Sequence, residues 1–183
     1  AHSGAGKTTL VKELLRECGT LYGLQLVITY TTRPPRFGEI DGKQYHFISV
    51  DEFREKIEQD FFIEWSTWYD HYYGSPLSVL EELTLGNSFI MVLDRSGAKE
   101  VLQAHPGVVL IWVTPPSIHE LKRRLMKRGV DSEAVIESRL KKAEIEIHQE
   151  EEEHFYQYHV LNDVLEEAVE NIKNIFRKEW GNQ

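Results

Sequence analysis

The chain opens with Ala1-His2-Ser3-Gly4-Ala5-Gly6-Lys7-Thr8 and runs directly into a helical pattern. This stretch follows the pattern G-x-x-x-x-G-K-[ST], with alanine in place of the first glycine. Gly4 and Gly6 permit backbone conformations in which N–H groups surround an anion at a helix N-terminus. Lys7 can reach the β- and γ-phosphates of a nucleotide, and the Thr8 hydroxyl can hold Mg²⁺. The stretch therefore predicts a phosphate-binding loop. Because such a loop normally follows a buried strand, we expect a strand upstream of Ala1.

Composition and net charge indicate a globular protein and argue against a membrane or nucleic-acid-binding protein. With 183 residues, of which 41% are hydrophobic, the chain suits one globular domain carrying inserted subdomains. The net charge of −9 argues against general nucleic-acid binding, which needs a basic surface. No apolar run reaches the roughly 18 residues of a membrane span. The lone Cys18 excludes an internal disulfide and fits a reducing compartment. We therefore expect a cytoplasmic protein that binds neither membrane nor nucleic acid. The oligomeric state is left open.

Hydrophobic periodicity predicts alternating strands and helices, which indicates a parallel sheet covered by helices on both faces. Gly19 is expected to end the first helix, Asp51 to cap the second, and Pro76 to open the third. Helices are predicted at 8–18, 49–59, 76–86, 96–104, 118–127, from 131 onward and at 164–180, and strands at 24–30, 61–68, 72–75, 88–94, 108–114 and 156–161.

Residues 31–45 contain two prolines and two glycines and therefore predict an exposed loop. Arg33 and Arg36 in this loop carry planar guanidinium groups that match phosphate oxygens, which suggests a second phosphate site. Downstream, the 61–68 pattern alternates, with Ile63 and Trp65 on one face and Glu64 on the other. The Glu64 carboxylate can accept two parallel hydrogen bonds from the N1–H and amino group of guanine.

The second half of the chain supplies further candidates. Asp94 ends an apolar strand, at the edge where open α/β sheets bind ligands. Ser117 and Glu120 match a capping box for the helix 118–127. In the following helix Arg139 is expected on the side opposite the apolar residues. The acidic run from Glu150 to Glu153 is interpreted as a solvated helix end.

Taken together, these residues resemble the guanylate kinases, which transfer a phosphoryl group from ATP to GMP. The resemblance covers nearly the whole chain. Its most specific part is T-T-R-P-P-R-F-G-E-I-D-G-K-Q-Y-H-F at 31–47, and S-G-A-G-K-T, F-I-E-W, Y-Y-G-S, P-P-S, R-L-M-K-R-G and N-D add to it. It implies a P-loop NTPase-type parallel sheet with a small antiparallel α+β insertion and a helical lid. Residues 1–36, 76–125 and 148–183 would form the core, 37–75 the GMP-binding insertion and 126–147 the lid.

The resemblance also implies roles for individual residues. ATP would be bound by Ser3, Gly4, Ala5, Gly6, Lys7, Thr8, Thr9, Arg128, Arg139 and Asn162. GMP would be bound by Thr29, Arg33, Arg36, Glu39, Tyr45, Glu64, Tyr73, Ser75 and Asp94. Among these, Lys7, Arg33, Arg128 and Arg139 would be catalytic. Thr29, Glu64 and Ser75 would read the guanine, and Asn162 would lie near the adenine. Thr8 would hold Mg²⁺, the expected cofactor.

One stretch departs from the family. Guanylate kinases typically carry two aspartates in L-D-x-D, followed after two residues by glycine. This chain reads Leu93-Asp94-Arg95-Ser96-Gly97, which keeps one aspartate and is interpreted as a loop two residues shorter. Two alternatives stay open at this point. One is a catalytically weakened guanylate-kinase-like binding domain, and the other is a ribose-bisphosphate kinase on the same scaffold.

Overall fold

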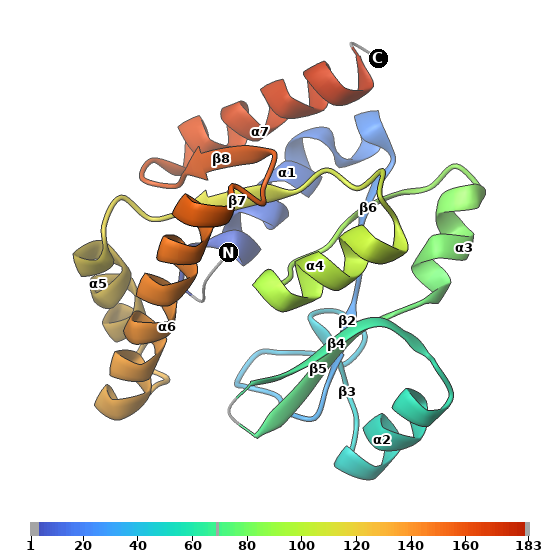
Figure 1. Cartoon of the computed structure of the whole chain (residues 1–183), viewed down its shortest axis with the longest axis horizontal. Coiled ribbons are helices and arrows are strands. Elements are labelled where there is room, and N and C mark those ends of the chain that lie inside the picture. Colours follow the sequence, from blue (N-terminus) through green and yellow to red (C-terminus); the bar gives the residue numbers. More distant parts are fainter. Residues whose placement is uncertain (1–3, 69, 182–183) are drawn as a thin grey trace. The chain divides into compact units, whose positions relative to one another are not determined.

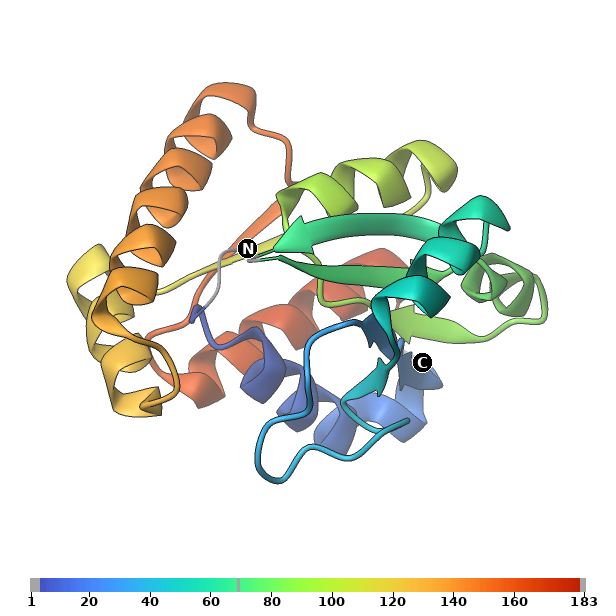
Figure 2. The same ribbon diagram turned by 90° about the horizontal axis from the view of Figure 1, so that it is seen from below.

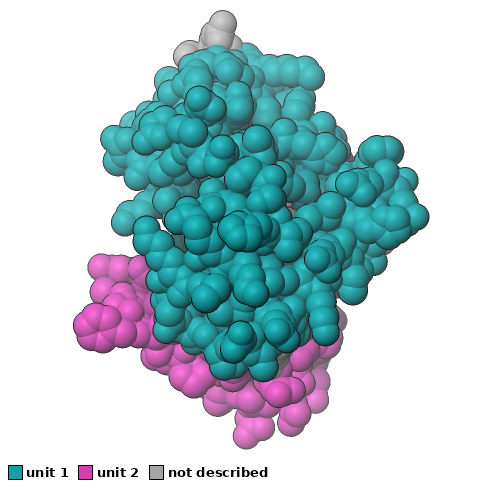
Figure 3. Space-filling view, turned by 90° about the vertical axis from the view of Figure 1, so that its left-hand side faces the viewer, with its two compact units in different colours: residues 1–22, 109–183 teal, residues 23–108 magenta. Residues whose placement is uncertain are grey.

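The computed structural model describes residues 4–68 and 70–181, so the predicted role of Ser3 lies outside the described residues. Two compact units are present, residues 1–22 with 109–183 and residues 23–108, coloured separately in Figure 3. The elements in chain order are α1 (Lys7–Tyr22), β1 (Leu24–Leu26), β2 (Thr29–Thr31), β3 (Tyr45–Phe47), α2 (Val50–Glu58), β4 (Phe62–Trp68), β5 (His71–Pro76), α3 (Ser78–Thr84), β6 (Ser88–Ile90), α4 (Arg95–Ala104), β7 (Ile111–Thr114), α5 (Ile118–Arg128), α6 (Glu133–Glu153), β8 (Tyr158–Leu161) and α7 (Leu165–Trp180).

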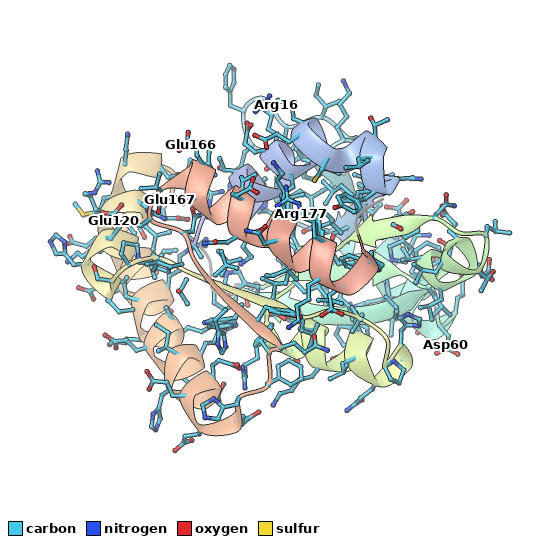
Figure 4. The ribbon with its side chains drawn as sticks, turned by 90° about the horizontal axis from the view of Figure 1, so that it is seen from above. Arg16, Asp60, Glu120, Glu166, Glu167 and Arg177 are labelled. Atoms are coloured by element: carbon cyan, nitrogen blue, oxygen red, sulfur yellow. The ribbon has the colours of Figure 1, made fainter. Side chains whose placement is uncertain are left out.

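The first unit contains the strand pair β7–β8 and the helices α1, α5, α6 and α7 (Figure 1). Strands β7 and β8 pair in parallel, from Ile111 opposite Tyr158 to Thr114 opposite Leu161. Helices α1 and α7 pack together through an edge-to-face contact between Tyr22 and Phe176. Arg16 on α1 and Arg177 on α7, both labelled in Figure 4, belong to the ion-paired surface of this helix pair. Helix α1 begins at Lys7, directly after the phosphate loop.

Helices α5 and α6 form a hairpin in the same unit, as Figures 1 and 2 show. Its small core consists of Leu121, Leu125, Ile136 and Ala143. Ser117 caps α5 by accepting a hydrogen bond from the Glu120 N–H at 3.0 Å, which is half of the predicted capping box, and the Glu120 carboxylate pairs with Arg123 and Arg124. Gly129, at φ 66°, ends this helix in the left-handed region that glycine tolerates. This hairpin occupies most of the segment expected to form a lid.

The second unit contains a parallel pair, β1 with β6, and a four-stranded sheet in the order β3-β2-β5-β4. In the four-stranded sheet β2 pairs in parallel with β3, and the other pairings are antiparallel. Aromatic rings fill one face of it. Phe53 of α2 stacks on Phe62 and on Tyr72, with ring centroids 4.5 and 5.2 Å apart. A Cβ at Gly74 would lie 2.9 Å from Phe62, which shows how closely the rings cover the strand.

The structure confirms the α/β class and corrects several local expectations. Gly19 lies inside α1, which continues to Tyr22 and ends at Gly23 with φ 59°. Ser49, rather than Asp51, caps α2, because it exchanges hydrogen bonds with Glu52 in a capping box. Pro76 closes β5 and does not begin a helix.

Strand patterns were the less accurate part of the prediction. The strand expected at 88–94 ends at Ile90. A register irregularity between Phe62 and Glu64 interrupts the alternation of β4. As a result Ile63 and Glu64 are both buried, whereas Trp65 is 40% exposed, contrary to the expected pairing of Ile63 with Trp65 on one face.

Candidate active site in two parts

The phosphate loop in the first unit is anchored from two directions. Gly4 and Gly6 both have φ of 88°, a conformation that residues with a Cβ rarely adopt. A Cβ on Gly4 would lie 2.7 Å from Leu121 Cδ1, and one on Gly6 would lie 2.3 Å from Asn162 Nδ2. Both glycines are therefore required by conformation and by space. Gly6 leads directly into α1, so the helix N-terminus follows the loop as a phosphate site needs.

Asn162 ties the end of β8 to this loop. Its side-chain amide donates a hydrogen bond of 2.7 Å to the carbonyl oxygen of Ala5, and it is 5% exposed. The structure thus gives Asn162 a supporting contact with the loop backbone, and its expected place near an adenine stays a prediction. Lys7 is partly buried, while Thr8 and Thr9 are exposed at the first turn of α1.

The two predicted lid arginines have different surroundings. Arg128 is exposed at the end of α5. Arg139 is 8% exposed and forms an ion pair of 3.1 Å with Asp131, whose side chain is 6% exposed. This corrects the expectation that Arg139 lies opposite the apolar face of α6, because it shares the buried side with Ile136 and Ala143. In the sequence Asp131 is recognisable only as part of a helix start. Because a buried charge needs a partner, a buried Arg139 would have pointed to a nearby acidic residue such as Asp131.

In the second unit a carboxylate holds the arginine loop. Arg33 Nη2 lies 2.9 Å from each carboxylate oxygen of Glu39, and Arg33 Nη1 donates to the Pro34 carbonyl at 2.6 Å. The Arg36 N–H donates to Glu39 Oε2 at 2.7 Å. Burial raises the pKa of Glu39, but the Arg36 N–H and the Arg33 guanidinium outweigh it, so the pKa is lowered overall. Glu39 therefore remains ionised and orients both arginine positions.

Aromatic rings complete the surroundings of Arg33. Its guanidinium carbon lies 5.4 Å from the centre of the Tyr45 ring and 5.7 Å from that of Phe47. The rings of Tyr45 and Tyr73 are 6.1 Å apart. Burial raises the pKa of the Tyr45 hydroxyl, so it stays a hydrogen-bond donor at neutral pH. The arrangement brings one buried cation and two phenols together, as a phosphate site requires.

Strand register places most predicted GMP residues on one face of the four-stranded sheet. Glu64 lies opposite Ser75 and Ser66 opposite Tyr73 in the β4–β5 pair. Tyr73 also lies opposite Thr31 of β2, and Thr29 lies opposite Tyr45 of β3. Because paired residues point to the same side and alternate along a strand, one face carries Thr29, Tyr45, Glu64, Tyr73 and Ser75. The aromatic core packed on α2 occupies the other face.

Glu64 has the most strongly shifted carboxyl group of this face. It is 4% exposed, and burial together with the nearby Asp94 and Glu100 raises its pKa from 4.5 to about 7, with Ser75 acting in the opposite direction. Ser75 Oγ is buried and forms no hydrogen bond of normal geometry with the described residues. Asp94 caps α4 by accepting from the Gly97 N–H at 2.9 Å. A buried carboxyl group beside a buried hydroxyl is suited to reading a polar ligand edge.

The loop and the polar sheet face define the class of protein first. A phosphate loop that opens a helix in an α/β fold is typical of P-loop nucleotide-binding proteins, and the second unit adds an arginine-and-carboxylate surface suited to a nucleoside phosphate. Within residues 4–68 and 70–181, no helix is long and apolar enough to cross a membrane.

Comparison with known proteins then identifies the family. The family model described as guanylate kinase matches residues 1–179. Guanylate kinase from Caldanaerobacter subterraneus is 44% identical over 174 residues, covering 94% of this chain and 82% of the relative. Guanylate kinase from Desulfitobacterium hafniense is 43% identical over 178 residues, covering 97% and 86%. The crystal structure of guanylate kinase from Anaplasma phagocytophilum is similar with a TM-score of 0.77 and 29% identity, covering 96% and 83%.

The chain therefore belongs to the guanylate kinase family. It is an enzyme, a nucleotide kinase that phosphorylates GMP with ATP. Nothing in the comparisons favours a ribose-bisphosphate kinase or a binding domain without activity.

Proposed function

We propose that the enzyme binds its two nucleotides on separate units, ATP at the phosphate loop and GMP on the polar face of the four-stranded sheet. The observation that carries this division is the strand register, which gathers Thr29, Tyr45, Glu64, Tyr73 and Ser75 on one face. The phosphate loop, by contrast, is built from Gly4, Gly6 and α1. Such a division suits a reaction with two nucleotide substrates.

At the loop, backbone N–H groups and Lys7 would hold the ATP phosphates, and Arg128 and Arg139 would offset the charge of the transferred group. Asp131 would hold Arg139 in place through their ion pair. In-line transfer needs little covalent chemistry from the protein, so these residues act by position and charge. Because the attacking GMP oxygen is already ionised, the reaction needs no general base.

Mg²⁺ fits this donor set through Thr8. The Thr8 hydroxyl stands at the exposed first turn of α1, and oxygen is the ligand that Mg²⁺ prefers. Among the residues that the structure describes, no group of three or more His, Cys, Asp or Glu side chains is placed to hold a metal. The ion would therefore be held by Thr8 together with nucleotide phosphates, and when bound it would neutralise charge between them.

On the sheet face, Arg33, Arg36, Tyr45 and Tyr73 would hold the GMP phosphate. Glu64 would accept hydrogen bonds from guanine N1–H and the 2-amino group, and Ser75 and Thr29 would contact the same base. Asp94 lies close enough to Glu64 to influence its ionisation. We place the reaction in the cytoplasm, where a reduced Cys18 is expected.

A direct assay tests this proposal. ADP formation is measured with ATP and Mg²⁺ while GMP, AMP, UMP and a ribose bisphosphate are offered separately. We expect strong turnover with GMP alone. Turnover with a ribose bisphosphate in place of GMP, or GMP binding by calorimetry without turnover, would contradict the proposal.

The Glu64→Ala variant should raise the GMP KM far more than the ATP KM. Equal effects on both KM values would show that Glu64 does not bind the guanine.

A further inference from the structure

Helix α4 approaches Glu64 more closely than a side chain at position 97 would permit. A Cβ on Gly97 would lie 2.6 Å from Glu64 Oε2, closer than real Cβ atoms come to a neighbour, and 3.2 Å from its Cδ, which is also a tight contact. Gly97 is absent from the residues with positive φ, so its backbone conformation suits any amino acid. Close approach to Glu64, and not conformation, is therefore the reason that glycine is needed here.

Two hydrogen bonds fix this spacing on either side of Gly97. The Gly97 N–H is held by Asp94 Oδ1 at 2.9 Å, which sets the start of α4. One turn further on, Glu100 Oε2 accepts from the Trp65 N–H at 3.3 Å and ties α4 to the strand beside Glu64. Asp94, Gly97 and Glu100 are spaced by three and lie on one side of the helix. The helix therefore has little freedom to retreat from an added methyl group.

The Glu64 carboxylate also has little freedom to turn elsewhere. It is almost fully buried, and Asp94 and Glu100 on α4 are both acidic. If a methyl group displaced it, the carboxylate would rotate against neighbouring like charges or away from Ser75, which lies opposite on β5. A new methyl group at position 97 would thus change the orientation of the carboxylate before anything else.

We propose that Gly97 is a specificity-determining positioning residue, whose bare backbone holds the Glu64 carboxylate in the orientation that accepts both guanine N–H donors. Gly97 itself does not touch the nucleotide. The proposal rests on the proposed role of Glu64 as guanine reader. It predicts that GMP selection depends on the space between α4 and β4 as well as on the chemistry of Glu64.

The Gly97→Ala variant tests this, with Gly107→Ala as the matched control. Gly107 also lacks a positive φ, and a Cβ there would meet only His105, at 3.4 Å. KM and kcat are measured for GMP, for ATP and for inosine monophosphate, which keeps the N1–H but lacks the 2-amino group. In Gly97→Ala we expect the GMP KM to rise roughly tenfold, because the tightly packed methyl group would displace the carboxylate that binds the base. The preference for GMP over inosine monophosphate should fall, the ATP KM should stay within about twofold, and Gly107→Ala should match the wild type.

A rescue variant separates positioning from damage to the fold. Glu64→Asp withdraws the carboxylate by one methylene, which makes room for the alanine methyl group. The fold increase in the GMP KM of Gly97→Ala/Glu64→Asp should therefore be smaller than the product of the fold increases of the two single variants. Wild-type GMP KM and selectivity in Gly97→Ala, while Glu64→Ala is impaired, would overturn the role of Gly97 alone. Equal losses for GMP, inosine monophosphate and ATP would reduce Gly97 to a structural residue, and an unimpaired Glu64→Ala would instead overturn the guanine-reading site.

Discussion

At the scale of single residues, Glu64 combines burial with a proposed role in guanine binding that requires a negative charge. Its pKa is raised to about 7 by burial and by the neighbouring Asp94 and Glu100. The folded enzyme therefore holds a proton on Glu64 more tightly than the unfolded chain does. The contribution of this group to stability is greatest at acidic pH and declines as pH rises from about 4.5 towards 7. Guanine binding has the opposite requirement, because only the carboxylate accepts both N–H donors.

We therefore predict that GMP binding weakens as pH falls below the Glu64 pKa, by up to tenfold for each pH unit. The measurement is kcat/KM for GMP between about pH 5.5 and 8.5 at saturating ATP, a window centred on the shifted pKa. A phosphate monoester titrates near pH 6, so the profile also contains the substrate. Glu64→Gln is the control, since it keeps the phosphate titration and removes the carboxyl group. Identical profiles for the two proteins would show that Glu64 does not titrate in this range.

Charge pairing explains a second residue-scale feature. Arg33 is 9% exposed, and a buried guanidinium is stable only with partners that offset its lost hydration. Glu39, the Pro34 carbonyl and the Tyr45 ring supply them. The loop from 33 to 39 is thus ordered by the groups that position its arginines. This is why a stretch whose two prolines and glycine predict an exposed loop holds Arg33 in a defined position.

At the scale of elements, the α5–α6 hairpin contains a buried ion pair between Asp131 and Arg139. We predict that Asp131→Ala lowers the free energy of unfolding by about 3–5 kcal/mol, the usual cost of removing one partner of a buried pair. It should also lower kcat, because Arg139 loses a support that fixes its orientation. Thermal melting and steady-state kinetics measure the two effects. Glu13→Ala is the control, because its ion pair with Arg16 lies at the surface and should contribute less than about 1 kcal/mol.

The end of α6 offers another test. Glu150 was expected in solvent with the acidic run around it, and the structure shows this to be wrong. It is buried, accepts from the Tyr156 N–H at 3.0 Å and contacts His159 Nε2 at 2.9 Å. Glu150→Ala would leave the buried N–H of Tyr156 without this acceptor and should cost about 1–3 kcal/mol. Glu151→Ala, at an exposed neighbouring position, should have almost no effect on chemical denaturation. Equal stability of the two variants would show that the hydrogen bond from the Tyr156 N–H to Glu150 does not stabilise the fold.

These elements also show what the sequence could and could not predict. The glycine-rich turn before α1, the ends of α5 at Ser117 and Gly129 and the two strands β4 and β5 follow local rules of spacing and turn chemistry, and they were predicted. Glu150 and Arg139 were misplaced because helical position alone does not say which neighbouring element covers a face. The irregularity in β4 was not predicted, because an alternating pattern does not show where a strand carries an extra residue. The closeness of Gly97 to Glu64 depends on tertiary packing and left no local pattern.

At the scale of the whole molecule, each of the two compact units carries its own part of the proposed chemistry. The phosphate loop lies in the unit formed by residues 1–22 and 109–183, and Arg33 lies in the unit formed by residues 23–108. Each part is stabilised by contacts within its own unit, such as Asn162 with Ala5 and Glu39 with Arg33. Binding of either nucleotide should therefore survive damage to the other site.

We test this independence with Lys7→Ala and Arg33→Ala. Lys7→Ala should reduce turnover by roughly a hundredfold or more, because it removes the cation that we propose binds the transferred phosphoryl group, while GMP affinity by calorimetry stays near that of wild type. Arg33→Ala should weaken GMP binding and leave ATP affinity unchanged. Circular dichroism verifies that both variants remain folded. If Lys7→Ala abolished GMP binding, or Arg33→Ala abolished ATP binding, the two nucleotides would depend on a shared set of residues. The assignment of one substrate to each unit would then be wrong, even though both variants had lost turnover as expected.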